Sequence, residues 1–213
     1  MKIVCIADTH CLHREVDLPD GDLLIFAGDM DFFQMQPTVV HDFNKWIGQQ
    51  PHRHKVVVPG NHDIALDGRA HLARRLITNA HLLLGDGVEL EGLKIWGSPI
   101  NPYANMPFGI SDRTQRRKHW AGIPADTHVL VTHFPPHGVL DRESPRAAHQ
   151  GCVELAEAIA KVNPLLHVFG HVHGAGGLKA LGTTYYVNAS LTDGDGLLSR
   201  EPIIMQMELD WKH

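Results

Sequence analysis

Five short apolar runs in this chain each stop abruptly at a residue that can bind a metal ion. The clearest run is 56–58, three consecutive valines that a Pro-Gly pair ends and that Asn61, His62 and Asp63 follow. β-Branched runs of this length prefer buried strands, and proline and glycine end them. The metal-competent residues that follow the five runs are Asp8 and His10, Asp29, Asn61, His133, and finally His171 with His173.

The segments between these runs predict an α/β fold. Apolar residues in segment 38–49 recur at intervals of three and four, which is the pattern of an amphipathic helix. A helical connection of this kind usually joins parallel strands in a right-handed unit. Further helices are predicted at about 68–77, 111–118 and 150–162. Strands are predicted at 2–7, 23–27, 56–58, 128–132, 165–169, 184–187 and 203–209, with an antiparallel meander at 81–84, 88–90 and 93–96.

The residues at the strand ends predict a metal centre. Parallel strands bring their carboxyl ends to one edge of a sheet, so residues far apart in the sequence are expected to meet there. Seven nitrogen and oxygen ligands suit two ions. Imidazole, carboxylate and amide ligands without thiolate favour Mn, with Fe, Zn, Ni or Co as alternatives. Two divalent ions outweigh the charge of Asp8 and Asp29, so the site would attract an anion such as phosphate.

Two divalent ions side by side also predict a reaction. They can activate a bridging water and clamp the attacking and leaving oxygens of an in-line displacement, without a serine or cysteine nucleophile. His62 is then expected to bind the phosphoryl oxygen or to protonate the leaving group. For Asp63 the sequence leaves two roles open, which are holding the His62 ring and capping the helix that follows.

Charge and composition narrow the class of protein. The formal net charge of −5, from 24 acidic and 19 basic residues, does not favour binding to extended nucleic acid. No apolar run approaches the roughly 20 residues that a membrane span needs, so no membrane partner is expected. Cys5, Cys11 and Cys152 form no C-x-x-C pair, which favours a reducing, cytoplasmic location. A length of 213 residues suits a single domain over residues 1–213.

The loop at 97–109 is the candidate for substrate selection. It is rich in proline and glycine and too irregular for a helix or strand, and a long loop in a small domain is often functional. Tyr103 and Phe108 are candidates for stacking on a base. Asn101 is the candidate phosphate-binding residue, with Asn188 as a second, although both asparagines are equally well explained as packing or turn residues.

Five sequence blocks carry a family resemblance. They resemble the signature blocks of the calcineurin-like metallophosphoesterases, and they are Asp8-x-His10, Gly28-Asp29, residues 60–63, Thr132-His133 and Gly170-His171-x-His173. The resemblance implies two mixed β-sheets packed as a sandwich with flanking helices. It also implies that Asp29 bridges two ions. One ion would be held by Asp8, His10, Asp29 and His173, and the other by Asn61, His133 and His171.

Within this superfamily the chain resembles the metallophosphoesterase-domain proteins of animals and their bacterial relatives, a branch linked to phosphodiester and cyclic-nucleotide hydrolysis. Some animal members lack the second histidine of the Gly-His-x-His block, which is present here as His173. We therefore expect a binuclear, metal-dependent phosphodiesterase that acts on small diesters or nucleotides by attack of a metal-bridging hydroxide. The alternatives are a metal-dependent phosphomonoesterase and a non-catalytic scaffold. The protein Ser/Thr phosphatases are disfavoured, because Gly28-Asp29 is not followed by their Asp-Arg-Gly triplet.

Overall fold

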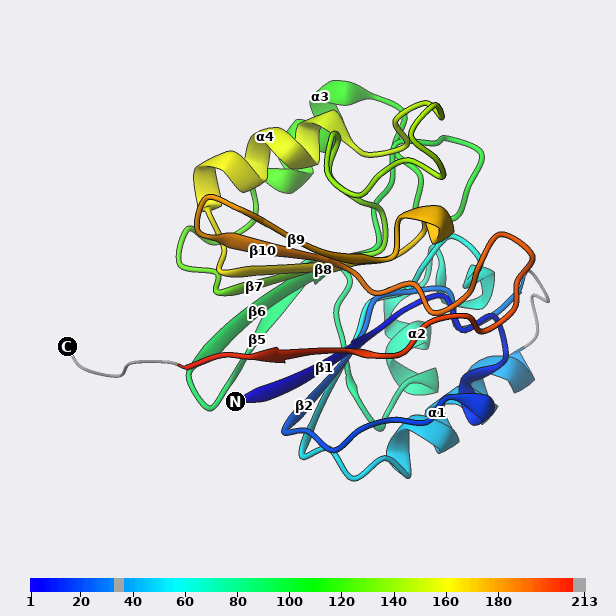
Figure 1. Cartoon of the computed structure of the whole chain (residues 1–213). Helices are drawn as coiled ribbons and strands as arrows, with labels where there is room; N and C mark the ends of the chain where they lie inside the picture. Colours follow the sequence, from blue (N-terminus) through cyan, green and yellow to red (C-terminus); the bar gives the residue numbers. More distant parts are fainter. Residues whose placement is uncertain (33–36, 209–213) are drawn as a thin grey trace.

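The computed structural model describes residues 1–32 and 37–208, and in this part of the chain two mixed β-sheets pack face to face (Figure 1). The first sheet has the order β11-β1-β2-β3-β4 and the second the order β5-β6-β7-β8-β10-β9. The strands of the first sheet are β11 (Ile203–Gln206), β1 (Lys2–Ile6), β2 (Leu23–Phe26), β3 (His54–Val57) and β4 (His81–Leu82). Those of the second are β5 (Asp86–Leu90), β6 (Leu93–Ser98), β7 (Val129–Thr132), β8 (Leu166–Phe169), β9 (Gly177–Leu181) and β10 (Thr184–Asn188).

Helices cover the outer face of each sheet. Figure 1 shows α1 and α2 on the outside of the first sheet and α3 and α4 on the outside of the second. The helices are α1 (Pro37–Gly48), α2 (Ala70–Leu76), α3 (Arg113–Trp120) and α4 (Val153–Val162). The loops of the described ranges contain the short 3-10 helices η1 (His13–Glu15), η2 (Ile64–Leu66) and η3 (His173–Ala175). The predicted α/β fold of two sheets with flanking helices is therefore confirmed.

The side chains of the strands alternate between two apolar clusters, and this explains why each sheet lies between the other sheet and a layer of helices. In β1, Ile3 and Cys5 belong to the apolar cluster between the sheets, whereas Val4 and Ile6 pack toward the helical side. Successive side chains of a strand point to opposite faces, so a strand that is apolar at every position is buried on both. The same holds in β7, where Val129 faces the other sheet and Leu130 packs with the α3 and α4 layer.

The predicted meander at 81–96 is only half correct. β5 and β6 form an antiparallel hairpin, but β4 pairs in parallel with β3 and belongs to the first sheet. The chain crosses from one sheet to the other between Leu82 and Asp86. Leu82 packs toward the helical side of the first sheet, while Leu83 lies in the cluster between the sheets. A run of leucines cannot reveal this change of partner, because each leucine is buried in either arrangement.

Two other elements differ from the expectation. β9 was not predicted, and its residues Leu178 to Leu181 are exposed, so they show no alternation. The last strand was expected to reach Leu209, which lies outside the described residues; β11 ends at Gln206. None of the helices in the described ranges combines the length and the apolar character that crossing a bilayer would require.

Candidate functional site

The polar residues at the strand ends meet where the carboxyl ends of the two sheets come together. Asp8 and His10 follow β1, Asp29 follows β2 and Asn61 follows β3, all in the first sheet. His133 follows β7, and His171 and His173 follow β8, in the second sheet. The site is therefore built across two sheets, not along one edge as the strand pattern alone suggested.

Asp8, His10 and His173 form one group of possible metal ligands, whose ligand atoms lie within 4.8 Å of one another. The Nε2 atoms of His10 and His173 are 3.3 Å apart, and His173 Nε2 is 3.5 Å from Asp8 Oδ1. His10 Nδ1 donates to the carbonyl of Asp31, and His173 Nδ1 donates to the carbonyl of Asp193. Each ring therefore presents an Nε2 lone pair to the other, and a cation between them would satisfy both lone pairs.

Asp8, Asp29 and His133 form a second such group, which Asn61 joins. His133 Nε2 lies 3.1 Å from Asp29 Oδ2 and 3.1 Å from Asn61 Oδ1. Its Nδ1 donates to the carbonyl of Ala27, 2.8 Å away. A ring nitrogen, a carboxylate oxygen and an amide oxygen thus converge, and once Nε2 gives up its proton they are the donor set of a divalent ion.

The pKa shifts of Asp29 and His133 favour a positive charge between their side chains. Burial raises the pKa of Asp29, but the facing His133 outweighs burial and holds that pKa below its ordinary value. Burial lowers the pKa of His133, but the carboxylate of Asp29 outweighs burial and raises it to about 9. A proton is therefore held between the two side chains, and a bound divalent ion would replace it.

His171 contributes through both its backbone and its ring. Its N–H donates to the carboxylate of Asp8, 3.0 Å from Oδ2, which fixes that carboxylate. Its ring stacks on Phe134 with the centroids 3.7 Å apart. Burial lowers the pKa of His171 to about 3, so the imidazole is neutral at pH 7 and can act as a ligand. Its ring centroid is 5.4 Å from that of His133, although His171 is in none of the groups of described residues whose ligand atoms lie within 4.8 Å of one another.

His62 lies beside the ligands, and its Nε2 is 3.8 Å from Asp29 Oδ2. Its side chain is 17% exposed, and burial lowers its pKa below the ordinary value. The backbone N–H of His62 donates to Asp29 Oδ1 at 2.8 Å. The backbone of His62 therefore orients the carboxylate of Asp29, the expected bridging ligand, while its ring lies next to that carboxylate.

Asp63 has neither of the two roles that the sequence left open. Its buried carboxylate accepts hydrogen bonds from the backbone N–H groups of Gly60, Asp29 and Asp31, at 2.7, 3.0 and 3.0 Å. Among the described residues its carboxylate bonds neither to the ring of His62 nor to an N–H of η2, and only its backbone carbonyl accepts from Leu66 in η2. Asp63 is thus a positioning residue that ties the loop after β3 to the loop after β2.

The loops that carry the ligands are strained. Asp8, His10, Asp29 and His171 have φ angles of 55°, 42°, 61° and 69°. Non-glycine residues in this left-handed region cost roughly 1–3 kcal/mol each, and such residues cluster at functional sites. Gly60 shows how tightly the loops approach, because a Cβ at this position would overlap the carboxylate of Asp29.

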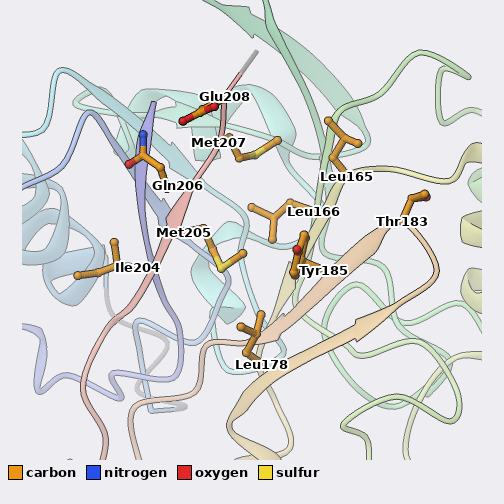
Figure 2. A pocket seen from close by; sticks show the side chains of 10 residues that line it. All are labelled: Leu165, Leu166, Leu178, Thr183, Tyr185, Ile204, Met205, Gln206, Met207 and Glu208. Carbon is orange, nitrogen blue, oxygen red and sulfur yellow. The ribbon is translucent and has the colours of Figure 1, made fainter. Parts of the chain in front are cut away.

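A polar cleft of about 440 Å³ opens over these residues. It is lined by Asp29, His62, Glu143, Gln150, His171, His173 and Gly194. A second cleft of about 430 Å³ is mostly apolar and lies between β11 and the strands β8 to β10 (Figure 2). It is lined by residues at the starts of β8 and β10, including Leu166 and Tyr185, and lies at the opposite ends of the strands from the predicted ligands. The chemistry therefore belongs to the polar cleft.

Asn101 does not fit its predicted role as a substrate-binding residue. It is fully buried, and its Nδ2 donates to the carbonyl of Pro107 while its Oδ1 accepts from the N–H of Tyr103. Its amide therefore holds the loop at 97–109 together. Asn188 is also fully buried, and it bonds to the carbonyls of Leu140 and Val172. Both asparagines have the structural role that the sequence left as the alternative.

The loop at 97–109 reaches the site indirectly. The ring of Tyr103 lies 5.7 Å from that of Phe134, and Phe134 stacks on His171. Phe108 packs instead against the cluster on the helical side of the first sheet. Sequence reasoning missed the role of Phe134, although its place directly after His133 was the available signal. It also missed Glu143 and Gln150, which no local pattern distinguishes from ordinary loop residues.

Comparisons with known proteins agree with this geometry. Residues 1–175 match the model of a family described as calcineurin-like phosphoesterase. Human metallophosphoesterase domain-containing protein 1 is 33% identical over an alignment covering 97% of this chain and 71% of the human protein. The UPF0046 protein K07C11.7 of Caenorhabditis elegans is 33% identical, covering 96% of this chain and 74% of the worm protein. The crystal structure of TT1561 of Thermus thermophilus shares the fold, with a TM-score of 0.61, 14% identity and coverage of 90% of this chain and 89% of that one.

Proposed function

The chain belongs to the calcineurin-like phosphoesterase family, and on that premise we propose that it is a phosphodiesterase that hydrolyses small diesters with two divalent ions. Membership of the family supports a metal-dependent phosphoester hydrolase. The convergence of Nε2, carboxylate and amide lone pairs in two adjacent groups is the observation that carries the proposal of two ions. Mn²⁺ is the ion we propose, because the ligands are imidazoles and oxygens without thiolate.

Each of the two ligand groups would hold one ion. Asp8, His10 and His173 would hold one, and Asn61, His133 and His171 the other, with Asp29 between them. When bound, divalent ions neutralise phosphate charge and supply a water activated for attack. The carbonyls of Asp31, Ala27 and Asp193 keep Nδ1 protonated on three of the imidazoles, so that each offers Nε2 to an ion.

His62 is the residue that we assign to the substrate. It lines the cleft beside Asp29. Its ring also lies with His10 and Asp29 in a third group of possible ligands, but the two groups described above are formed without it. Because burial lowers its pKa, the ring is neutral at pH 7 and donates one N–H. We assign that N–H to a phosphoryl oxygen, where it stabilises charge as the bond to the leaving group breaks. Asp63 supports this arrangement by fixing the loop that carries Asn61 and His62.

The negative charge of Glu143 supports the proposal of a diester in preference to a monoester. The carboxylate of Glu143 lines it, and Asp29 is the other acidic residue in the lining. A monoester carries about two negative charges near neutral pH and a diester one, so repulsion by Glu143 penalises the monoester more. A volume of about 440 Å³ suits a small molecule, and the net charge of −5 does not favour extended nucleic acid as a substrate.

The test compares a diester with its matching monoester. Metal-stripped protein is given Mn²⁺ together with bis(p-nitrophenyl) phosphate or p-nitrophenyl phosphate, and the release of p-nitrophenol is followed. We expect Mn²⁺-dependent turnover that prefers the diester and falls by at least about 100-fold in His62→Ala and Asp29→Ala. His41→Ala, a substitution of an exposed histidine on α1, is the matched control and should keep wild-type turnover. Preference for the monoester would favour a phosphomonoesterase, and no turnover with any divalent metal would favour a non-catalytic scaffold.

A further inference from the structure

Part of the cleft lining plays no role in holding ions or phosphate. The proposed metal and phosphate chemistry uses four of the lining residues, Asp29, His62, His171 and His173. The lining residues without a role so far are Glu143, Gln150 and Gly194. Within the described part of the chain, this lining includes no apolar side chain. The remainder of a substrate bound here would therefore face a carboxylate and a carboxamide, which select hydrogen-bonding groups over hydrocarbon.

Glu143 is an exposed residue whose carboxylate contacts the segment that carries a predicted metal ligand. Its Oε2 accepts a hydrogen bond from the N–H of Gly174, 2.6 Å away, and Gly174 directly follows His173 in η3. A Cβ on residue 174 would overlap the backbone of Glu143, so the glycine permits this close contact. Among the described residues, no hydrogen bond uses the second oxygen of Glu143, and this oxygen remains available to a ligand.

The loop that carries Glu143 and Gln150 is closed at its base by a buried carboxylate. Asp141 is 3% exposed, and its Oδ2 accepts from the N–H groups of Gly138 and Gly151 at 2.9 and 3.3 Å. Its Oδ1 lies 2.7 Å from Nδ1 of His149, and its carbonyl accepts from the N–H of Gln150. The two cleft residues are therefore held by a preorganised loop, as selective binding requires.

A carboxylate in this position recognises a hydroxyl group. Hydrogen bonds from a hydroxyl to a carboxylate are short and strong, and acidic side chains bind ribose hydroxyls in this way in dinucleotide-binding folds. We propose that Glu143, supported by Gln150, accepts a hydrogen bond from a sugar hydroxyl beside the scissile phosphate. This proposal rests on the phosphodiesterase function proposed above.

A pair of substrates that differ by one hydroxyl tests the proposal. In 3′,5′-cyclic AMP the 2′-hydroxyl is the free hydroxyl of the sugar, and it is missing from 2′-deoxy-3′,5′-cyclic AMP. We expect the Mn²⁺-loaded protein to prefer the ribonucleotide in kcat/KM by a factor on the order of 10 to 100. In Glu143→Ala this ratio should fall to about 1. In Glu143→Gln, whose amide oxygen still accepts from Gly174, the ratio should fall below one third of the wild-type value.

The ratio separates recognition of the hydroxyl from a purely structural role. If Glu143 only anchors Gly174, the variants will slow both nucleotides equally and the ratio will stay at the wild-type value, which overturns the proposal. Equal rates for the two nucleotides in the wild type, or turnover of bis(p-nitrophenyl) phosphate but of neither nucleotide, also overturn it while leaving the phosphodiesterase standing. Glu89→Gln, on β5, is the matched control and should leave the ratio unchanged.

Discussion

The hydroxyl of Thr132 is predicted to hold the turn that carries His133. Thr132 ends β7 and is fully buried. Its hydroxyl donates to the carbonyl of Phe134 at 2.7 Å and lies 2.9 Å from Nε2 of His167. Burial lowers the pKa of His167 to about 3, so this ring is neutral and its Nε2–H donates to the hydroxyl. A single oxygen thus joins the turn after β7 to His167 on β8.

Thr132→Val removes the hydroxyl and keeps the shape. It leaves the carbonyl of Phe134 and the Nε2–H of His167 without that partner, and each unsatisfied buried group costs about 1–3 kcal/mol. Part of this cost is offset because the buried hydroxyl itself no longer has to be desolvated. We expect a net loss of about 3 kcal/mol in the free energy of unfolding, which corresponds to a fall in Tm of roughly 6–12 °C for a chain of this size.

The same substitution should reduce activity. The turn places His133, and Phe134 stacks on His171, so a shift of the turn misplaces two predicted ligands. A displacement near 1 Å typically costs on the order of 100-fold in rate. Thermal and urea unfolding of the metal-stripped protein measures stability, and Mn²⁺-dependent diester turnover measures activity. Thr132→Ser keeps the hydroxyl and loses only a buried methyl group, so it should lose about 1 kcal/mol, clearly less than Thr132→Val. Thr114→Val, on the exposed face of α3, should stay near wild type in Tm.

A double-mutant cycle makes the reasoning refutable. If the hydroxyl and His167 form one network, His167→Leu should cost less stability in the Thr132→Val background than in the wild type, by at least about 1 kcal/mol. Strict additivity of the two substitutions would refute the network. A Thr132→Val protein with wild-type Tm and wild-type turnover would refute the predicted role of the hydroxyl altogether.

Two further predictions concern a close approach and a buried ion pair. Gly60→Ala should reduce Mn²⁺ binding and diester turnover by at least about 100-fold, since its methyl group would displace the Asp29 carboxylate. Gly68→Ala is the control: the φ of +69° at Gly68 makes this substitution cost stability, but no atom of the described residues beyond its chain neighbours lies within 4 Å of the added methyl group, so metal binding and turnover should be kept. Burial raises the pKa of Glu154, but Arg116 and Arg113 outweigh burial and lower it to about 2. The two arginines therefore stabilise the folded protein fully at pH values above 4.5, the ordinary pKa of a glutamate, and this stabilisation is lost as the pH falls toward 2. In urea unfolding, the difference in the free energy of unfolding between Glu154→Gln and the wild type should therefore become smaller from pH 4.5 to pH 2. A difference that is constant with pH would contradict this assignment.

The strand ends could be predicted from the sequence because their signal is local. A buried run that stops at Asp29 or Asn61 is visible without knowledge of the partners of the strand. The arrangement in two sheets came from the family resemblance, since periodicity does not identify which sheet a strand joins. β4 shows the difficulty, because Leu82 and Leu83 are equally apolar but face opposite sides of the first sheet. β9 was missed for the opposite reason, as an exposed edge strand has no apolar face to detect.

The details of the site depend on long-range contacts that a sequence pattern does not contain. For Asp63 the sequence left two roles open, holding the ring of His62 or capping the following helix, yet its carboxylate bonds to the backbone of the loop after β2. Asn101 was expected in the cleft because a loop amide can reach a phosphate, yet it is buried within its own loop. Glu143 reaches the cleft only because Gly174 lies next to it in space.

The number of metal ions bound per chain tests the central claim most directly. Metal-stripped protein would be saturated with Mn²⁺, separated from unbound ions by gel filtration and analysed for metal and protein content. The two adjacent ligand groups predict two ions per chain in the wild type and at most one in Asp29→Ala, which lacks the carboxylate between them. One ion or none per wild-type chain at saturation, or two in Asp29→Ala, would contradict the account.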